Sequence, residues 1–161
     1  MHAIDDDSAG FDGVERAHVR NVVGIEDFEW VSFADPSMRV PLPVPLSQAR
    51  ITLISTAGAH EAGQPSLGPG GHAALIPVDA EIELSHGGYD TERASSDPEV
   101  VYPVRTLQAL SDAGVIGSLA PTVISTMGFV PDGTRLFHRA VPAAVRQIHA
   151  EQSHLALLVP A

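Results

Sequence analysis

Apolar residues come in short runs from residue 50 onward, and their spacing predicts an alternation of strands and helices. RITLISTAG, residues 50–58, is apolar, rich in β-branched side chains and ends in glycine, which is typical of a strand buried on both faces of a parallel sheet. A second strand is expected near residues 122–125, and a final buried strand at HLALLVP, residues 154–160. Between them, AALIPV and EIELSHG predict either two strands with a turn at residues 79–80 or one extended segment leading into one strand.

Two segments have helical periodicity. In residues 102–114, Val104, Leu107 and Leu110 share one face, and Gly114 provides a natural stop. In residues 135–152, apolar side chains recur at helical spacing, and Pro142 lies either in the first turn of a short helix or at a kink in a longer one. The resulting order predicts an α/β domain at residues 50–161: a mostly parallel sheet with helices packed on it in flavodoxin- or Rossmann-like layers.

Residues 1–49 predict an N-terminal extension that ends in a proline-rich arm. Residues 11–33 are mixed in character and are compatible with a short helix. Residues 35–49 carry four prolines, which exclude a helix or a central strand because proline lacks the backbone donor. Since Leu42, Val44 and Leu46 are too apolar for a free linker, we expect an extended arm that lies on the domain.

Charge excludes several classes of partner. The 161 residues include 20 acidic and 9 basic side chains, for a net charge of −11, and the basic ones form no cluster. Neither nucleic acid nor an anionic membrane is an expected partner, because both are bound through lysine and arginine. The acidic N-terminus does not resemble a signal peptide, and no apolar run is long enough to span a membrane, so the expected location is cytoplasmic. Cysteine is absent, which excludes disulfides and thiolate chemistry within these residues.

Candidate chemistry follows the predicted strands. In open parallel sheets, ligands bind just beyond the carboxyl ends of the strands. Three of the four main predicted strands are followed by hydroxyl groups and glycine, and two by histidine. We therefore expect a shared pocket for a small molecule, with the loop at residues 83–100 as one wall. The expected substrate-binding residues are Ser55, Thr56, Gly58, Gly87, Gly88, Tyr89, Asp97, Ser125, Thr126 and Gly128.

The histidines and carboxylates admit several interpretations. His86 with Asp90 and Asp97 fits an acid/base group with orienting carboxylates, and His60 fits a second base, because histidine is the natural proton carrier near neutral pH. The alternative is that His86 and the aspartates only cap segments and form turns. No cofactor is required, although a divalent metal such as zinc, held by His60, His72 and His86, is another alternative. Arg105 either binds a substrate carboxylate or, as we favour, pairs with Asp97 or Glu99.

Three blocks carry a resemblance to a known family: PLSQARITLISTAGAH, residues 45–60, the block from SHGGYDTERASSDPEV to VISTMG, residues 85–128, and HLALLVP. Residues 43–159 resemble the selenoprotein B subunits of glycine, sarcosine and betaine reductase and the related D-proline reductase subunit. The resemblance implies reductive cleavage of a carbon–nitrogen bond in a small amino acid or betaine. It also implies a selenocysteine or cysteine, with a second cysteine close by, directly after the last strand.

The chain departs from that pattern, because the redox pair is missing from its 161 residues. We therefore expect an oxidoreductase-like subunit that shapes a pocket for a small amino-acid-like or cyclic-amide substrate, with the thiol supplied by a partner chain. The alternatives are a stand-alone isomerase or hydrolase that uses His60, His86 and Asp90, with or without a metal, and a non-catalytic structural partner. Because the final strand leaves apolar surface uncovered, we expect a homo-oligomer or a hetero-oligomer with a cysteine-containing paralogue.

Overall fold

The computed structural model describes residues 20–21, 24, 38, 40–128, 130 and 132–161. By its internal contacts the chain divides into two units, Met1–Arg39 and Val40–Ala161, and nearly all of the described residues belong to the second. Most of the segment predicted as a short helix, residues 11–33, and residues 35–37 and 39 of the predicted arm lie outside the described residues. Residues 40–45 form no helix or strand, and both Leu42 and Leu46 are exposed.

The second unit contains seven strands and three α-helices among its described residues, so the predicted α/β class is confirmed. The helices are α2 (Thr91–Ser96), α3 (Val104–Asp112) and α4 (Val141–Ala150). Short 3-10 turns lie at Leu46–Gln48 and Pro98–Val100, and a π-helical segment at Leu136–Ala140 runs into α4. The strands are β1 (Arg50–Ser55), β2 (Ala59–Glu61), β3 (Ala73–Pro77), β4 (Ile82–Leu84), β5 (Ser118–Leu119), β6 (Thr122–Thr126) and β7 (Leu155–Val159).

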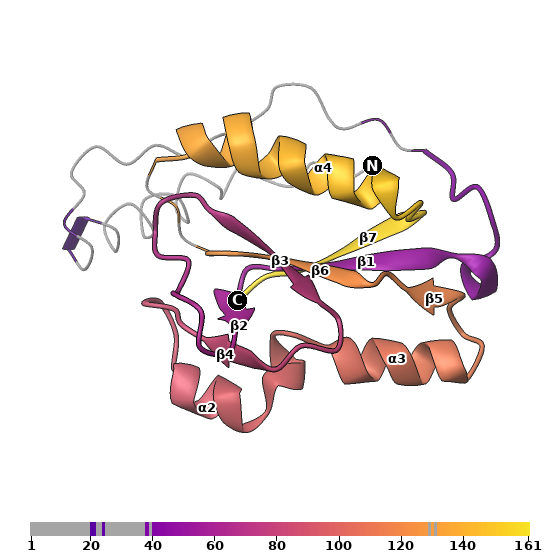
Figure 1. Ribbon diagram of the computed structural model, residues 1–161, viewed down its shortest axis with the longest axis horizontal. Helices are drawn as coiled ribbons and strands as arrows, with labels where there is room; N and C mark the ends of the chain where they lie inside the picture. Colours follow the sequence, from indigo (N-terminus) through magenta and orange to yellow (C-terminus); the bar gives the residue numbers. More distant parts are fainter. Residues whose placement is uncertain (1–19, 22–23, 25–37, 39, 129, 131) are drawn as a thin grey trace, which may run out of the picture. The chain divides into compact units, whose positions relative to one another are not determined.

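The main sheet is mixed, with β1 at its centre (Figure 1). On one edge, β1 pairs in parallel with β7; on its other edge it pairs in parallel with β5 at its start and with β6 at its end. β3 then pairs antiparallel with β6, and β2 and β4 form a separate antiparallel pair. The segments AALIPV and EIELSHG therefore supply two strands, joined by a turn, but each strand pairs with a different neighbour rather than with the other.

The core lies on the side of the sheet that carries α3. Ile51 and Leu53 of β1 pack with Val123 of β6 against Leu107 of α3 and Tyr102. The pair β2–β4 covers the same face beside α3, while α4 lies across the opposite face (Figure 1). α3 ends as predicted, because Gly114 follows it with a φ of 71°, a conformation that glycine adopts without strain.

α4 begins with a distorted turn. Pro142 lies in its first turn, and the N–H of Val141 bonds to the carbonyl of Leu136, five residues earlier. Proline cannot donate to the preceding turn, and a widened π-type turn is one way for a helix to accommodate the missing bond. Pro142 thus lies in the first turn of α4 while the π-helical segment precedes it. No residue of α4 is fully buried, so this face of the sheet is covered less completely than the face under α3.

The final strand is where the burial prediction was wrong. β7 forms as expected, but Leu155 is 40% exposed and Leu158 is 67% exposed. β7 lies at the edge of the sheet, and only β1 pairs with it within the described part of the chain. An apolar run at a sheet edge has the same composition as a central strand, and the sequence pattern does not separate the two.

Candidate functional site

The connections after β1 and β6 meet at one rim of the sheet. The two strands are parallel and in register, with Ser55 opposite Ser125, so their carboxyl ends lie side by side. Beyond them, Ala57 and Met127 form an isolated bridge, and the N–H of Gly58 donates to the carbonyl of Thr126 at 2.9 Å. The structure therefore brings together two of the three segments that were expected to form a shared pocket.

Gly58 also joins the third segment to this rim. Its carbonyl accepts a hydrogen bond from the N–H of Ser85 at 3.3 Å, which draws the loop after β4 toward the end of β1. A β-carbon at this position would lie 2.3 Å from the Ser85 carbonyl oxygen, and the φ of Gly58 is +68°. Only glycine fits such an approach and such a backbone conformation. Gly58 is thus a structural residue that places His86 beside the ends of β1 and β6.

His86 is the centre of the rim. Its Nδ1 atom lies 2.9 Å from the backbone nitrogen of Gly88, and its Nε2 atom lies 3.3 Å from that of Gly128. Its ring is in contact with the ring of Tyr89, at 4.7 Å between centroids, and the Tyr89 hydroxyl donates to the carbonyl of Ala57 at 2.8 Å. Burial lowers the pKa of His86 below its ordinary value of 6.5, so the ring is neutral at pH 7 and can accept a proton.

A hydroxyl and the end of β7 complete the rim. A β-carbon built on Gly128 would lie 3.2 Å from His86 Nε2, 3.3 Å from Thr56 Oγ1 and 2.7 Å from the carbonyl oxygen of Ala161. Thr56 Oγ1 accepts the N–H of Ala161 at 2.9 Å, and the Thr56 hydroxyl proton has no acceptor among the described residues. An imidazole, a hydroxyl donor and the carbonyl oxygen of Ala161 thus border a single point beside the N–H of Gly128, where they can bind a small polar group or move a proton.

Other predicted site residues lie beneath the rim. His60 is 4% exposed, with its ring nitrogens 3.0 Å from Ser85 Oγ and 3.2 Å from the Glu61 carbonyl oxygen. Ser55 is fully buried and donates to the carbonyl of Val101, and Ser125 is fully buried as well. These side chains are enclosed beneath the rim and support it from below.

The remaining predicted residues are exposed or have local partners. Asp90 caps α2 by accepting the N–H of Arg93, and Asp97 lies exposed at the end of that helix. Arg105 pairs with Glu99 at 3.3 Å, which is the interaction that we favoured. Gly87 is exposed beside the rim, and Thr126 is half-buried at the end of β6. His60, His72 and His86 do not form a group of three, and among the described residues no cluster of three or more histidine or carboxylate side chains could hold a metal.

Sequence reasoning missed the contribution of β7 to the rim. The carbonyl of Val159 accepts the N–H of Thr56 at 3.1 Å, and Ala161 follows at the same edge. The predicted parallel sheet could have indicated this contribution, because a last strand that is parallel to the first must end at the same edge of the sheet.

Within the described residues, no helix combines the length and the apolar character that crossing a membrane requires. The fold and the rim define the class: an α/β protein whose polar groups gather where parallel strands end.

Comparison with known proteins finds similarity to one family of reductase proteins. Residues 73–141 match the family described as glycine/sarcosine/betaine reductase selenoprotein B. The D-proline reductase subunit gamma of Acetoanaerobium sticklandii is 28% identical over 142 residues, which cover 85% of this chain and 59% of the relative. No solved structure matches. Both matches support the family resemblance that the sequence blocks indicated, and the chain matches about three fifths of the length of the relative.

Proposed function

We propose that the chain is the substrate-binding part of a reductase that acts on a small amino-acid-like or cyclic-amide substrate, with a thiol or selenol supplied by a partner chain. The observation that carries the proposal is the convergence of His86, Thr56 and the N–H of Gly128 at one point of the rim. The family resemblance supports the reaction class, and the name of the relative suggests D-proline as the first substrate to test.

The hydrogen bonding of His86 indicates what the rim would bind. A neutral imidazole has one acceptor nitrogen and one N–H group. Backbone N–H groups nevertheless point at both ring nitrogens, that of Gly88 at 2.9 Å and that of Gly128 at 3.3 Å. If Nδ1 accepts at the shorter distance, Nε2 carries the proton and faces another donor. A carboxylate or carbonyl oxygen that lies beside both Nε2 and the N–H of Gly128 would accept from both donors, and the Thr56 hydroxyl could add a third.

The thiol must come from outside these 161 residues, because none of them is cysteine. The relative is named as a subunit, which supports an assembly of several chains. The end of β7, after which the family resemblance puts the redox residue, borders the same point as His86. We propose that a partner chain places its thiol there and that His86 handles the proton released or taken up in the reaction.

The test is D-proline binding to the full chain, followed by turnover with the cysteine-containing partner. Because hydrogen bonds to a charged group contribute about 1.5–3 kcal/mol, His86→Gln is expected to weaken binding roughly 10- to 100-fold. His149→Gln, an exposed histidine on α4, is the matched control and should bind as the wild type does. Pyrrolidine, which lacks the carboxylate, should not bind.

Three results would overturn this proposal: D-proline binding by His86→Gln equal to that of the wild type, equal binding of pyrrolidine, or no binding of D-proline, glycine, sarcosine or betaine by the complex. Calorimetry gives the affinity, and the fold of each variant is checked from its backbone amide spectrum.

A non-catalytic structural role is the second candidate, and the open edge of β7 favours it. Leu155, Leu157 and Leu158 are exposed along a strand that has only one neighbour among the described residues. A chain with this role would stabilise a catalytic partner, and His86→Gln would then leave the turnover of the complex unchanged.

A further inference from the structure

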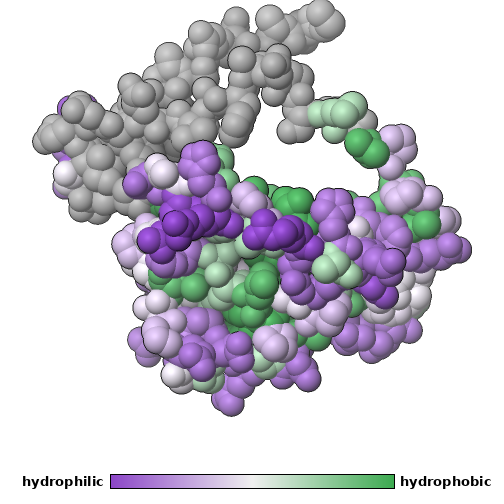
Figure 2. Space-filling model, turned by 45° about the horizontal axis from the view of Figure 1, so that its top comes forward, coloured by the Kyte–Doolittle hydropathy of each residue, from purple (hydrophilic) through white to green (hydrophobic). Residues whose placement is uncertain are grey.

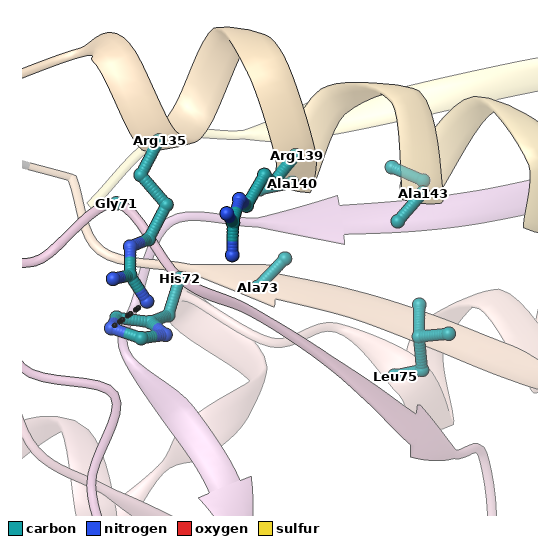
Figure 3. A pocket seen from close by; sticks show the side chains of 9 residues that line it. Gly71, His72, Ala73, Leu75, Arg135, Arg139, Ala140 and Ala143 are labelled. Carbon is teal, nitrogen blue, oxygen red and sulfur yellow. Dashed lines mark hydrogen bonds between the residues drawn. The ribbon is translucent and has the colours of Figure 1, made fainter.

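A second recess lies between β3 and α4, on the face of the sheet opposite α3. Its volume is about 260 Å³, and it is lined by residues of β3, of the π-helical segment and of the first half of α4. Figure 3 shows Arg135 and Arg139 extending from the helix toward the start of β3, where His72 lies. The expected function of the chain makes no use of these groups.

The recess is positively charged in a protein that is strongly negative. Arg135 donates to His72 Nε2 at 3.2 Å, which leaves its other N–H groups available. Arg139 has no ion-pair or hydrogen-bond partner among the described residues. None of the described residues that line the recess is acidic, although the whole chain carries 20 acidic side chains against 9 basic ones. Two guanidinium groups without a carboxylate partner make a site for an anion.

The rest of the recess is apolar and is built from small side chains. Leu75 of β3 is 43% exposed and faces the helix, and the lining residues of the helix other than the arginines are alanines. With α4 turned toward the reader, apolar side chains gather in the middle of the face, among polar ones (Figure 2). Gly71, just before β3, lies close to the start of the π-helical segment. Its φ is +66°, and a β-carbon there would lie 3.0 Å from the backbone nitrogen of Leu136, so glycine allows this close approach. The anion is thus bound beside an apolar wall.

We propose that this recess binds a small carboxylate with a short apolar body. The planar guanidinium groups of Arg135 and Arg139 match the two oxygens of a carboxylate, and Leu75 with the alanines covers the hydrocarbon part. The volume is below the usual range of about 300–1,000 Å³ for pockets that bind drug-sized ligands, which indicates a ligand of only a few carbon atoms. Inorganic phosphate fits less well, since it would leave the apolar wall exposed to water.

The recess is distinct from the rim around His86, and the inference therefore goes beyond the proposed function. The two sites are nevertheless neighbours in the sheet. Ala73 lines the recess and pairs with Thr126, two residues before Gly128, which contacts His86. Because β3 is antiparallel to β6, its first residues lie at the same edge as the last residues of β6.

The experiment is a titration of the full-length, 15N-labelled chain with butyrate, followed through the side-chain Nε–H signals of the arginines. Saturable shifts are expected at Arg135 and Arg139. Arg139→Gln should weaken butyrate binding at least tenfold, whereas Arg146→Gln, an exposed arginine on α4 outside the recess, should leave it unchanged. Butyramide, the neutral analogue, should not bind, and butyrate should bind more tightly than acetate or inorganic phosphate.

Any of four results would overturn the inference: no saturable shift, equal weakening by Arg139→Gln and Arg146→Gln, binding of butyramide, or phosphate binding as tight as that of butyrate. His86→Gln separates this site from the rim. It should leave butyrate binding in the recess unchanged, and loss of that binding would show that the recess is not a separate site. Backbone spectra of each variant confirm that the fold is kept.

Discussion

At the scale of single residues, the surroundings of His86 predict its response to pH. Burial lowers the pKa of His86 in the folded chain, so the unfolded chain takes up a proton first as the pH falls below the ordinary value of 6.5. The stability that His86 contributes is therefore complete above pH 6.5 and is lost as the pH falls toward its folded-state pKa. We expect its ring signal to titrate at a pH below the ordinary value of 6.5.

Proton NMR of the histidine rings provides the measurement, with His86→Gln to assign the signal. The same variant should lose less stability than the wild type between pH 7.5 and 5.5 in thermal melts. A midpoint for His86 at or above 6.5 would contradict the burial argument.

Ser55 of β1 and Ser125 of β6 lie opposite each other in the sheet. Their hydrogen bonding predicts opposite effects of a serine-to-alanine substitution on the free energy of unfolding. Ser55 Oγ donates to the carbonyl of Val101 at 2.7 Å and accepts the N–H of Ala57 at 3.2 Å. Ser55→Ala leaves both groups unpaired and should lower the free energy of unfolding by about 1–3 kcal/mol. Ser125 Oγ is buried without a partner among the described residues, so Ser125→Ala should leave stability unchanged or raise it by about 1 kcal/mol.

Chemical denaturation of the two variants beside the wild type measures both effects. A large loss for Ser125→Ala would show that its hydroxyl binds a buried water or a ligand, and equal losses would contradict the pairing of Ser55.

The same serines show how far sequence can predict a site. The residues after the strands were chosen by type and position, and the parallel register does bring the segments after β1 and β6 together. Which hydroxyls face a ligand depends on the alternation of side chains between the two faces of a strand. Ser55 points into the core, whereas its neighbour Thr56 reaches the rim. A shift of one residue in the strand boundary reverses that assignment, and composition does not determine the boundary so closely.

At the scale of elements, apolar segments were predicted well and short polar ones were missed. β1, β6 and α3 follow from apolar runs and from a glycine stop. β2, β5 and α2 have between two and six residues and contain too few apolar side chains to establish a period. β2 and α2 border the rim, which explains why His60 was placed in a loop although it belongs to a buried strand. Asp90, for which a catalytic role was one alternative, caps α2.

At the scale of the whole α/β unit, burial is uneven. The core is built between the sheet and α3 with β2–β4, whereas α4 has no fully buried residue and β7 is exposed along its length. An exposed edge strand with apolar side chains is a template for pairing with another chain. The relative that is named as a subunit is consistent with such pairing.

We therefore expect the 161-residue chain to associate at micromolar concentration through the free edge of β7. Leu158 is 67% exposed on this strand, and Leu158→Lys should shift the population toward monomers, because a charge on an edge strand opposes pairing. Val115→Lys, at an apolar residue that is 49% exposed after α3, is the matched control and should not change the mass. Light scattering after gel filtration gives the mass directly. A single species at 16.9 kDa for the wild type would contradict self-association and leave β7 as an edge for a different chain.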